Sequence, residues 1–229
     1  MREEYTRENY PSFGKKYAGE KAIISLTSWK ARIDTVSKTL YSLLKQCPGF
    51  HTVLVLSEEE FPKMMDELPE NLNLFVKNNL IEVLWVYKNY KSFKKVLFTM
   101  DKYRDVPVIS ADDDCIYTCN YAQELYDSWR YNRTDIVLYR KNNKKHLQGP
   151  CVLYSPKIIR INSKLLENMN DFRKKSNSDD TFFTNFLLKA GSTFSFTENL
   201  NCPFIFHDEI APLHPEYKKS KAFSECYRK

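Results

Sequence analysis

The chain has 229 residues, of which 42% are hydrophobic and 28% are charged, and its formal net charge is +6. This composition favours a packed core over a disordered chain. Mean hydropathy is −0.54, and no stretch approaches the roughly 20 apolar residues of a membrane helix, which argues against an integral membrane protein. The length predicts one domain, at 21–214, between an N-terminal extension at 1–20 and a basic C-terminal tail at 215–229.

Positive charge is concentrated in residues 130–175, which hold twelve Lys or Arg against three Asp or Glu. The tail at 215–229 adds five against two. Such stretches are either solvated surface or a face that binds phosphates, nucleic acid or anionic lipid head groups. Charge alone does not choose among these partners.

The six cysteines have irregular spacing with no Cys-x-x-Cys pair, and the first 21 residues lack the apolar core of a secretory signal. We therefore expect reduced thiols in core or incidental positions rather than disulfides or a metal site. These features predict a cytoplasmic protein, and the basic stretch adds the hypothesis of peripheral contact with the inner face of the membrane.

Strand-like and helix-like segments alternate along the first half of the chain. Short apolar runs rich in β-branched residues predict strands, and apolar residues three or four apart predict helices. The expected strands are 22–28, 51–57, 81–87 and 106–114, with helices at 33–44 and 92–100 and a polar connection at 57–69. This series predicts an α/β fold with a mostly parallel central sheet flanked by helices.

The second half is expected to add one helix at 121–131 and two strands, at 135–140 and 149–155. An amphipathic helix then follows Asp179 and Asp180 and is closed by Gly191. No internal repeat or low-complexity segment interrupts this order.

Ligands bind beyond the carboxyl ends of the strands in parallel sheets of this kind. The residues at those ends are Thr27, Ser28 and Ser57, together with the triplet Asp112, Asp113 and Asp114. These positions are where we expect the functional site.

Three adjacent carboxylates after an apolar strand repel one another, and a divalent cation relieves that repulsion. In an extended segment Asp112 and Asp114 point the same way and can share one ligand, while Asp113 points elsewhere. Ligands that are all oxygens suit Mg²⁺ or Mn²⁺, which complete their shells with water and substrate phosphates. The alternative is a strand-to-helix turn whose carboxylates cap the next helix.

Several short motifs occur in a characteristic order over roughly residues 22–190. They lie at 24–28 with Arg32 and Ile33, 57–62, 92–95, 111–117, 149–150 and 178–180. In order and spacing they resemble small bacterial glycosyltransferases of the GT-A fold, a single domain whose nucleotide-binding half is Rossmann-like. The absence of a glycine-rich phosphate loop agrees with that fold, which holds diphosphate through a metal.

The resemblance implies a nucleotide-diphospho-sugar donor, usually a UDP-sugar, with Mn²⁺ or Mg²⁺ as cofactor and the Asp triplet as the DxD motif. It assigns Asp114 to the metal, Asp112 to the metal or the ribose, and Asp113 to the vicinity of the donor sugar. The other positions that it assigns to the donor are Thr27, Ser28 and Arg32 in the nucleotide pocket, and Lys94 or Lys95 near the base or diphosphate.

Asp179 and Asp180 resemble the acidic pair that supplies the base in inverting enzymes of this fold. An acceptor hydroxyl must lose its proton as it attacks, and a carboxylate within hydrogen-bond reach can take it. We expect Asp180 to be the base and Asp179 to be its neighbour or a group that positions the acceptor, although the pair also suits a simple helix N-terminus. The resemblance further suggests His207 as a metal ligand, with His214 as a competitor.

The acceptor implied is a saccharide or lipid-linked saccharide hydroxyl in polysaccharide biosynthesis, and Trp29 and Tyr117 are candidates for stacking on sugar rings. One alternative is a sugar nucleotidyltransferase or another metal-dependent phosphoryl-transfer enzyme, although the segment after the first strand lacks the glycines these usually have. The other is a non-enzymatic basic protein that binds nucleic acid. No nucleic-acid-binding motif is present, so we expect no such partner.

Overall fold

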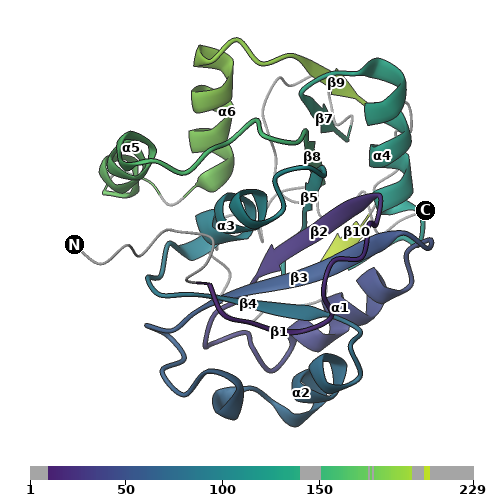
Figure 1. Ribbon diagram of the computed structural model, residues 1–229, viewed down its shortest axis with the longest axis vertical. Helices are drawn as coiled ribbons and strands as arrows, with labels where there is room; N and C mark the ends of the chain where they lie inside the picture. Colours follow the sequence, from purple (N-terminus) through teal and green to yellow (C-terminus); the bar gives the residue numbers. More distant parts are fainter. Residues whose placement is uncertain (1–9, 140–150, 175, 177, 198–203, 207–229) are drawn as a thin grey trace.

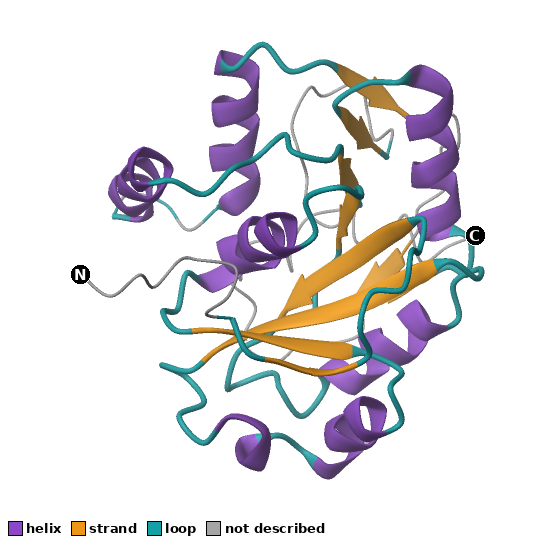
Figure 2. Ribbon diagram, viewed as in Figure 1, coloured by secondary structure: helices purple, strands orange, loops and turns teal. Residues whose placement is uncertain are grey.

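The computed structural model describes residues 10–139, 151–174, 176, 178–197 and 204–206. These residues form three layers, with an eight-stranded sheet between two sets of helices (Figures 1 and 2). The strands are β1 (Ser12–Gly14), β2 (Ala22–Thr27), β3 (Phe50–Ser57), β4 (Glu82–Val86), β5 (Val108–Ser110), β6 (Cys115–Tyr117), β7 (Ile136–Leu138), β8 (Val152–Tyr154), β9 (Phe194–Phe196) and β10 (Phe204–Phe206). The helices are α1 (Val36–Leu44), α2 (Glu70–Lys77), α3 (Lys94–Lys102), α4 (Tyr121–Asn132), α5 (Ser163–Arg173) and α6 (Asp179–Lys189), with 3₁₀ turns at Met64–Glu67 and Lys91–Phe93.

The main sheet has the order β1-β4-β3-β2-β5-β8-β7-β9. Strands β4, β3, β2 and β5 are parallel neighbours, while β1, at the edge, and β8 are antiparallel to β4 and β5. Strand β6 pairs with β10 in a separate two-stranded ribbon. The mostly parallel sheet that the sequence predicts is therefore confirmed, and the carboxyl ends of β2, β3, β4 and β5 meet at one edge.

Alternating side chains of the central strands feed two apolar cores. Ile23 and Val55 point to the layer of α3, α5 and α6, whereas Ile24 and Leu54 point to the layer of α1, α2 and α4. Figure 1 shows these two layers on opposite sides of the sheet. Burial on both faces explains why the central strands have continuous apolar sequences rather than alternating ones.

The predicted strands and helices of the first half are confirmed with small shifts, but the fourth strand is shorter than expected. It ends at Ser110, and residues 113–114 form a turn before β6. Helices α2 and α5 and strands β1, β6, β9 and β10 are not predicted from the sequence. Strand β1 lies inside the predicted N-terminal extension, where Ser12 pairs with Leu84.

The predicted tail at 215–229, the loop at 149–150 and both His207 and His214 lie outside the described residues. Within the described ranges, none of the helices combines the length and the apolar character needed to cross a lipid bilayer.

Candidate active site

The carboxyl edge of the parallel strands gathers the predicted residues from distant parts of the sequence. Ser28 follows β2, and Asp112 to Asp114 follow β5, which pairs directly with β2. Arg32 lies in the turn before α1, and Lys95 lies in the first turn of α3. The topology therefore brings cations from two helical regions to an acidic loop.

Asp113 points into the protein and is 3% exposed. The Ser28 hydroxyl donates to its Oδ2 at 2.6 Å, and Arg32 Nη2 lies 2.9 Å from its Oδ1. Thr39 of α1 donates to the backbone carbonyl of Asp113 at 2.8 Å. Burial raises the pKa of Asp113 to about 6, although Arg32 and Ser28 act in the opposite direction.

Asp114 and Asp112 are more accessible, with side chains 21% and 31% exposed. Arg32 Nη1 donates to Asp114 Oδ2 at 2.7 Å, so this guanidinium spans two members of the triplet. Burial and the neighbouring charge of Asp112 raise the pKa of Asp114 in spite of Arg32. Burial lowers the pKa of Arg32, but the three carboxylates outweigh it and the net pKa is raised.

Asp112 and Asp114 fit the divalent cation that the sequence predicts. They offer two hard oxygen donors on one accessible loop, where burial and the neighbouring charge of Asp112 raise the pKa of Asp114. No group of three or more His, Cys, Asp or Glu side chains among the described residues is arranged to hold a metal. Two protein carboxylates suffice for Mg²⁺ or Mn²⁺ when water and substrate phosphates supply the remaining ligands.

Lys95 connects the triplet to the second acidic motif. Its Nζ lies 2.6 Å from Asp112 Oδ1 and 3.2 Å from Asp179 Oδ2. Asp179 is the first residue of α6, after the N-cap Ser178, and it is 7% exposed. Asp180 is the second residue of the same helix, and its side chain lies outside the description, so its role as base stays a prediction.

Lys94 points to other partners than Lys95 does. Its buried ammonium lies 3.6 Å from Glu60, after β3, and donates to Asn89 Oδ1, after β4, at 3.2 Å. Burial lowers the pKa of Lys94 to about 8, although Glu60 opposes that shift. Neither Glu60 nor Asn89 is assigned a role from the sequence. Each follows a predicted strand, and Glu60 also belongs to the motif at 57–62.

Three other predicted residues, Thr27, Trp29 and Tyr117, lie next to Ser28 or the Asp triplet. The Thr27 hydroxyl donates to the carbonyl of Val55 at 2.7 Å, inside the sheet. The Tyr117 hydroxyl accepts a hydrogen bond from the Asp112 backbone N–H at 2.7 Å, and its ring packs 4.5 Å from that of Tyr121. Tyr117 is 5% exposed, so the expected stacking of this ring on a sugar is wrong. Trp29 is half-buried beside Ser28.

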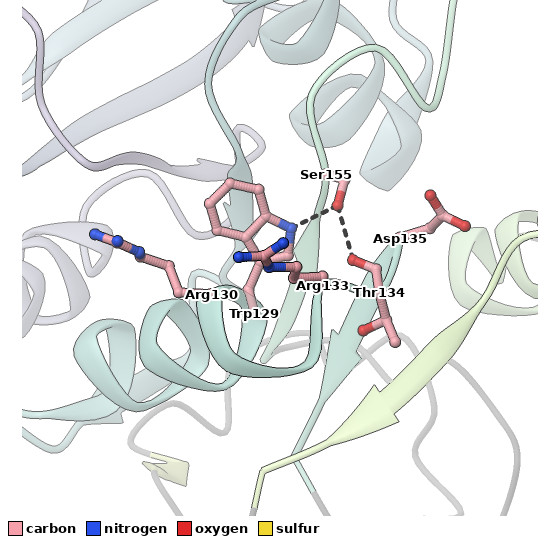
Figure 3. Close-up of a pocket in the computed structure, with 6 residues that line it drawn as sticks. All are labelled: Trp129, Arg130, Arg133, Thr134, Asp135 and Ser155. Carbon is pink, nitrogen blue, oxygen red and sulfur yellow. Dashed lines mark hydrogen bonds between the residues drawn. The ribbon is translucent and has the colours of Figure 1, made fainter.

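A pocket of about 350 Å³ lies elsewhere, at the C-terminal end of α4 (Figure 3). Trp129 Nε1 donates to Ser155 Oγ at 2.6 Å, and Ser155 donates to the carbonyl of Thr134 at 3.0 Å. Ser155 follows Tyr154, which pairs with Val108 at the amino end of β5. The pocket is therefore at the opposite edge of the sheet from the Asp triplet.

Solved glycosyltransferase structures share this architecture. GlyE from Streptococcus pneumoniae TIGR4 matches with a TM-score of 0.52 and 15% identity, over 79% of this chain and 46% of GlyE. TarS 1-349 of S. aureus in complex with UDP-GlcNAc matches with a TM-score of 0.52 and 12% identity, over 90% of this chain and 64% of TarS 1-349. The mannosyltransferase PcManGT from Pyrobaculum calidifontis, in complex with GDP-Man and Mn²⁺, matches with a TM-score of 0.56 and 10% identity, over 82% of this chain and 57% of PcManGT.

The chain has a glycosyltransferase fold. It spans less than two thirds of the length of each of these three structures. No protein-family model matches the chain, and no curated protein matches it by sequence. The fold that the resemblance implies is thus confirmed by structure.

Proposed function

We propose that the chain is a metal-dependent, inverting glycosyltransferase that moves a sugar from a nucleotide-diphospho-sugar to a hydroxyl of a saccharide or lipid-linked saccharide. The observation that carries the proposal is the meeting of two acidic motifs at the carboxyl edge of the sheet. One ammonium, that of Lys95, lies within 3.2 Å of both Asp112 and Asp179. Two neighbours of the fold hold nucleotide-sugars, UDP-GlcNAc in one and GDP-Man with Mn²⁺ in the other.

The acidic residues divide into two roles in this proposal. Asp112 and Asp114 hold Mn²⁺ or Mg²⁺, which when bound offsets the charge that develops on the leaving diphosphate. Asp113 stays inside and orients the loop through Ser28 and Arg32. Thr27, Ser28 and Arg32 then border the nucleotide, and we infer a UDP-sugar as the donor.

The acceptor lies on the side of α6. Asp180 takes the proton of the attacking hydroxyl as the new glycosidic bond forms on the face opposite the departing diphosphate. Asp179 is the weaker candidate for the base because its Oδ2 is already engaged by Lys95. In this proposal Asp180 is therefore the base, and Asp179 is a neighbour held by Lys95. His207 remains the proposed third protein ligand of the metal.

The test is nucleotide binding followed by turnover. In the presence of Mn²⁺ we expect UDP and UDP-sugars to raise the unfolding temperature of the wild type. At a hundredfold excess of ligand over Kd, the free energy of unfolding should increase by about 2.7 kcal/mol. Asp114→Asn should abolish the shift and lower UDP release by at least 100-fold. Asp66→Asn, on an exposed 3₁₀ turn, is the control and should behave as wild type. A wild type that binds no nucleoside diphosphate would overturn the proposal.

We also propose that a cytoplasmic, lipid-linked acceptor is met at an anionic membrane surface. The support is the basic stretch at 130–175, whose described part includes the exposed side chains of Arg130, Arg133 and Arg160. In flotation assays, the protein should float with phosphatidylglycerol vesicles at low salt and stay in the bottom fraction at high salt. Equal recovery with phosphatidylcholine vesicles would contradict this.

A further inference from the structure

Lys95 is a buried ammonium placed between carboxylates of two separate elements. The residue is 3% exposed, and its Nζ is 2.6 Å from Asp112 in the loop after β5 and 3.2 Å from Asp179 in α6. The two carboxylate oxygens therefore cannot be farther apart than the sum of these distances. An ammonium has three donors, so it can hold both acids at the same time.

The backbone of Lys95 is itself fixed to the sheet. Ser25, in the middle of β2, donates its hydroxyl to the Lys95 carbonyl at 2.5 Å and lies 2.7 Å from the hydroxyl of Thr99, one turn further along α3. Ser25 is fully buried. The ammonium thus extends from an anchored helical turn. The backbone of Asp112 is held separately, by its own hydrogen bond to the Tyr117 hydroxyl.

The adjacent lysine makes different direct contacts. Lys94 is buried to the same degree, but its ammonium faces Glu60 and Asn89 at the ends of β3 and β4. Two successive residues of one helix thus contact different partners, a glutamate and an asparagine for Lys94 and two aspartates for Lys95. Only Lys95 connects the Asp triplet to α6 among the ion pairs of the described residues.

We propose that Lys95 is a positioning residue that sets the separation between the donor-side carboxylate Asp112 and the acceptor-side start of α6. This inference rests on the proposed function and deepens it. Transfer needs the reacting atoms within about 3–3.5 Å, and a displacement of about 1 Å can cost a factor of 100 in rate. In this proposal Lys95 keeps α6, which carries the proposed base Asp180, close to Asp112, and it does not contact the diphosphate of the donor.

The first measurement separates positioning from donor binding. In Lys95→Met we expect kcat to fall about 100-fold, while the Kd for UDP with Mn²⁺ stays within about threefold, because the Asp112 and Asp114 donors remain. Lys95→Arg retains a cation and should recover part of kcat. Lys77→Met, exposed at the end of α2, is the control for loss of a lysine and should match the wild type. A rise in Kd for UDP that accounts for the whole loss would assign Lys95 to the donor and overturn the proposal.

The second measurement asks whether Lys95 and Asp179 act as a unit. The double variant Lys95→Met/Asp179→Asn should lose no more kcat than Lys95→Met alone, because the second change removes the same contact. Multiplied losses would show that the residues act separately and would overturn the inference. The same cycle in urea unfolding needs no substrate, so it tests the coupling even if the wild type binds no nucleotide. Coupling in unfolding without nucleotide binding would overturn the proposed function, and with it the positioning role of Lys95 in transfer, although the contact between Lys95 and Asp179 would be supported.

Discussion

Two clusters of buried charge lie at opposite edges of the same sheet, and they balance their carboxylates differently. At the amino end of β4, Glu82 is 1% exposed and engages His51, Lys102 and Tyr103. Burial opposes its charge, but these three partners outweigh burial and lower the pKa of Glu82 to about 2. At the carboxyl end of β5, burial raises the pKa of Asp113 to about 6.

The two pKa values shift in opposite directions because the number of carboxylates relative to hydrogen-bond donors differs between the clusters. One carboxylate at the amino edge is surrounded by donors, whereas three successive carboxylates at the carboxyl edge share Arg32, Lys95 and Ser28. The first arrangement stabilises the fold. The second keeps negative charge that a bound cation can stabilise further, which is typical of functional sites.

The largest effect on stability is expected from Glu82→Ala. Removal of this carboxylate leaves Lys102 and the buried His51 and Tyr103 without their shared partner, and breaking a buried pair costs about 3–5 kcal/mol. Urea unfolding should show the loss as a lower midpoint with an unchanged slope. Nucleotide affinity of the folded protein should stay at the wild-type value, because the cluster lies at the other edge.

Glu70→Ala, on the exposed first turn of α2, is the matched control and should change the unfolding free energy by less than about 0.5 kcal/mol. If both variants unfold at the same urea concentration, the amino-edge cluster is not a source of stability and the comparison fails.

At the carboxyl edge, loss of negative charge should stabilise the fold, whereas at the amino edge it should destabilise the fold. The pH dependence of unfolding tests this difference. Because the folded pKa of Asp113, about 6, is above its ordinary 3.8, the folded state binds more protons than the unfolded state between these values. Ionised Asp113 therefore destabilises the folded state, fully above pH 6 and progressively less as the pH falls toward 4. At 1.36 kcal/mol per pKa unit, the folded state should gain about 3 kcal/mol over this range. Glu82 acts oppositely, since its stabilisation is lost as pH falls from about 4.5 toward 2.

Asp113→Asn in chelator-treated protein isolates the first of these effects. The variant should be at least as stable as the wild type at pH 7, and the gain in wild-type stability between pH 7 and pH 5 should be smaller in it. Urea unfolding at the two pH values measures both quantities. An identical pH dependence in wild type and variant would show that Asp113 is not the group responsible.

The sequence predicts the parallel strands well because each is buried on both faces and its apolar run is continuous, as in 51–57. It does not predict α2, a short helix of sequence ENLNLFVK in which only Leu72 and Val76 are buried. Strand β1 has three residues, and pairing with β4 rather than local propensity makes it a strand. These elements depend on tertiary contacts that periodicity does not contain.

The candidate site also combines features that the sequence predicts with features that depend on tertiary contacts. The triplet Asp112 to Asp114 is recognisable because it follows an apolar strand, and strand alternation predicts a difference in direction between Asp113 and its two neighbours. The structure produces that difference through a turn at 113–114 and through Arg32, which is 81 to 82 residues earlier in the chain. The contact of Lys95 with both acidic motifs depends on packing of α3 against α6, which no local pattern encodes.

The smallest effect is expected from Ser28→Ala, which removes a single donor from the carboxyl edge. The Ser28 hydroxyl donates to Asp113 Oδ2 at 2.6 Å, and a hydrogen bond to a charged group contributes about 1.5–3 kcal/mol. Because the ionised carboxylate gains more from this bond than the protonated one, the loss at pH 7 should exceed the loss at pH 5. Ser37→Ala, whose hydroxyl accepts from Asn71 on the surface, should lose less than about 0.5 kcal/mol at either pH. Equal losses for Ser28→Ala at both pH values would mean that Asp113 keeps one protonation state across this range, and its raised pKa would then be wrong.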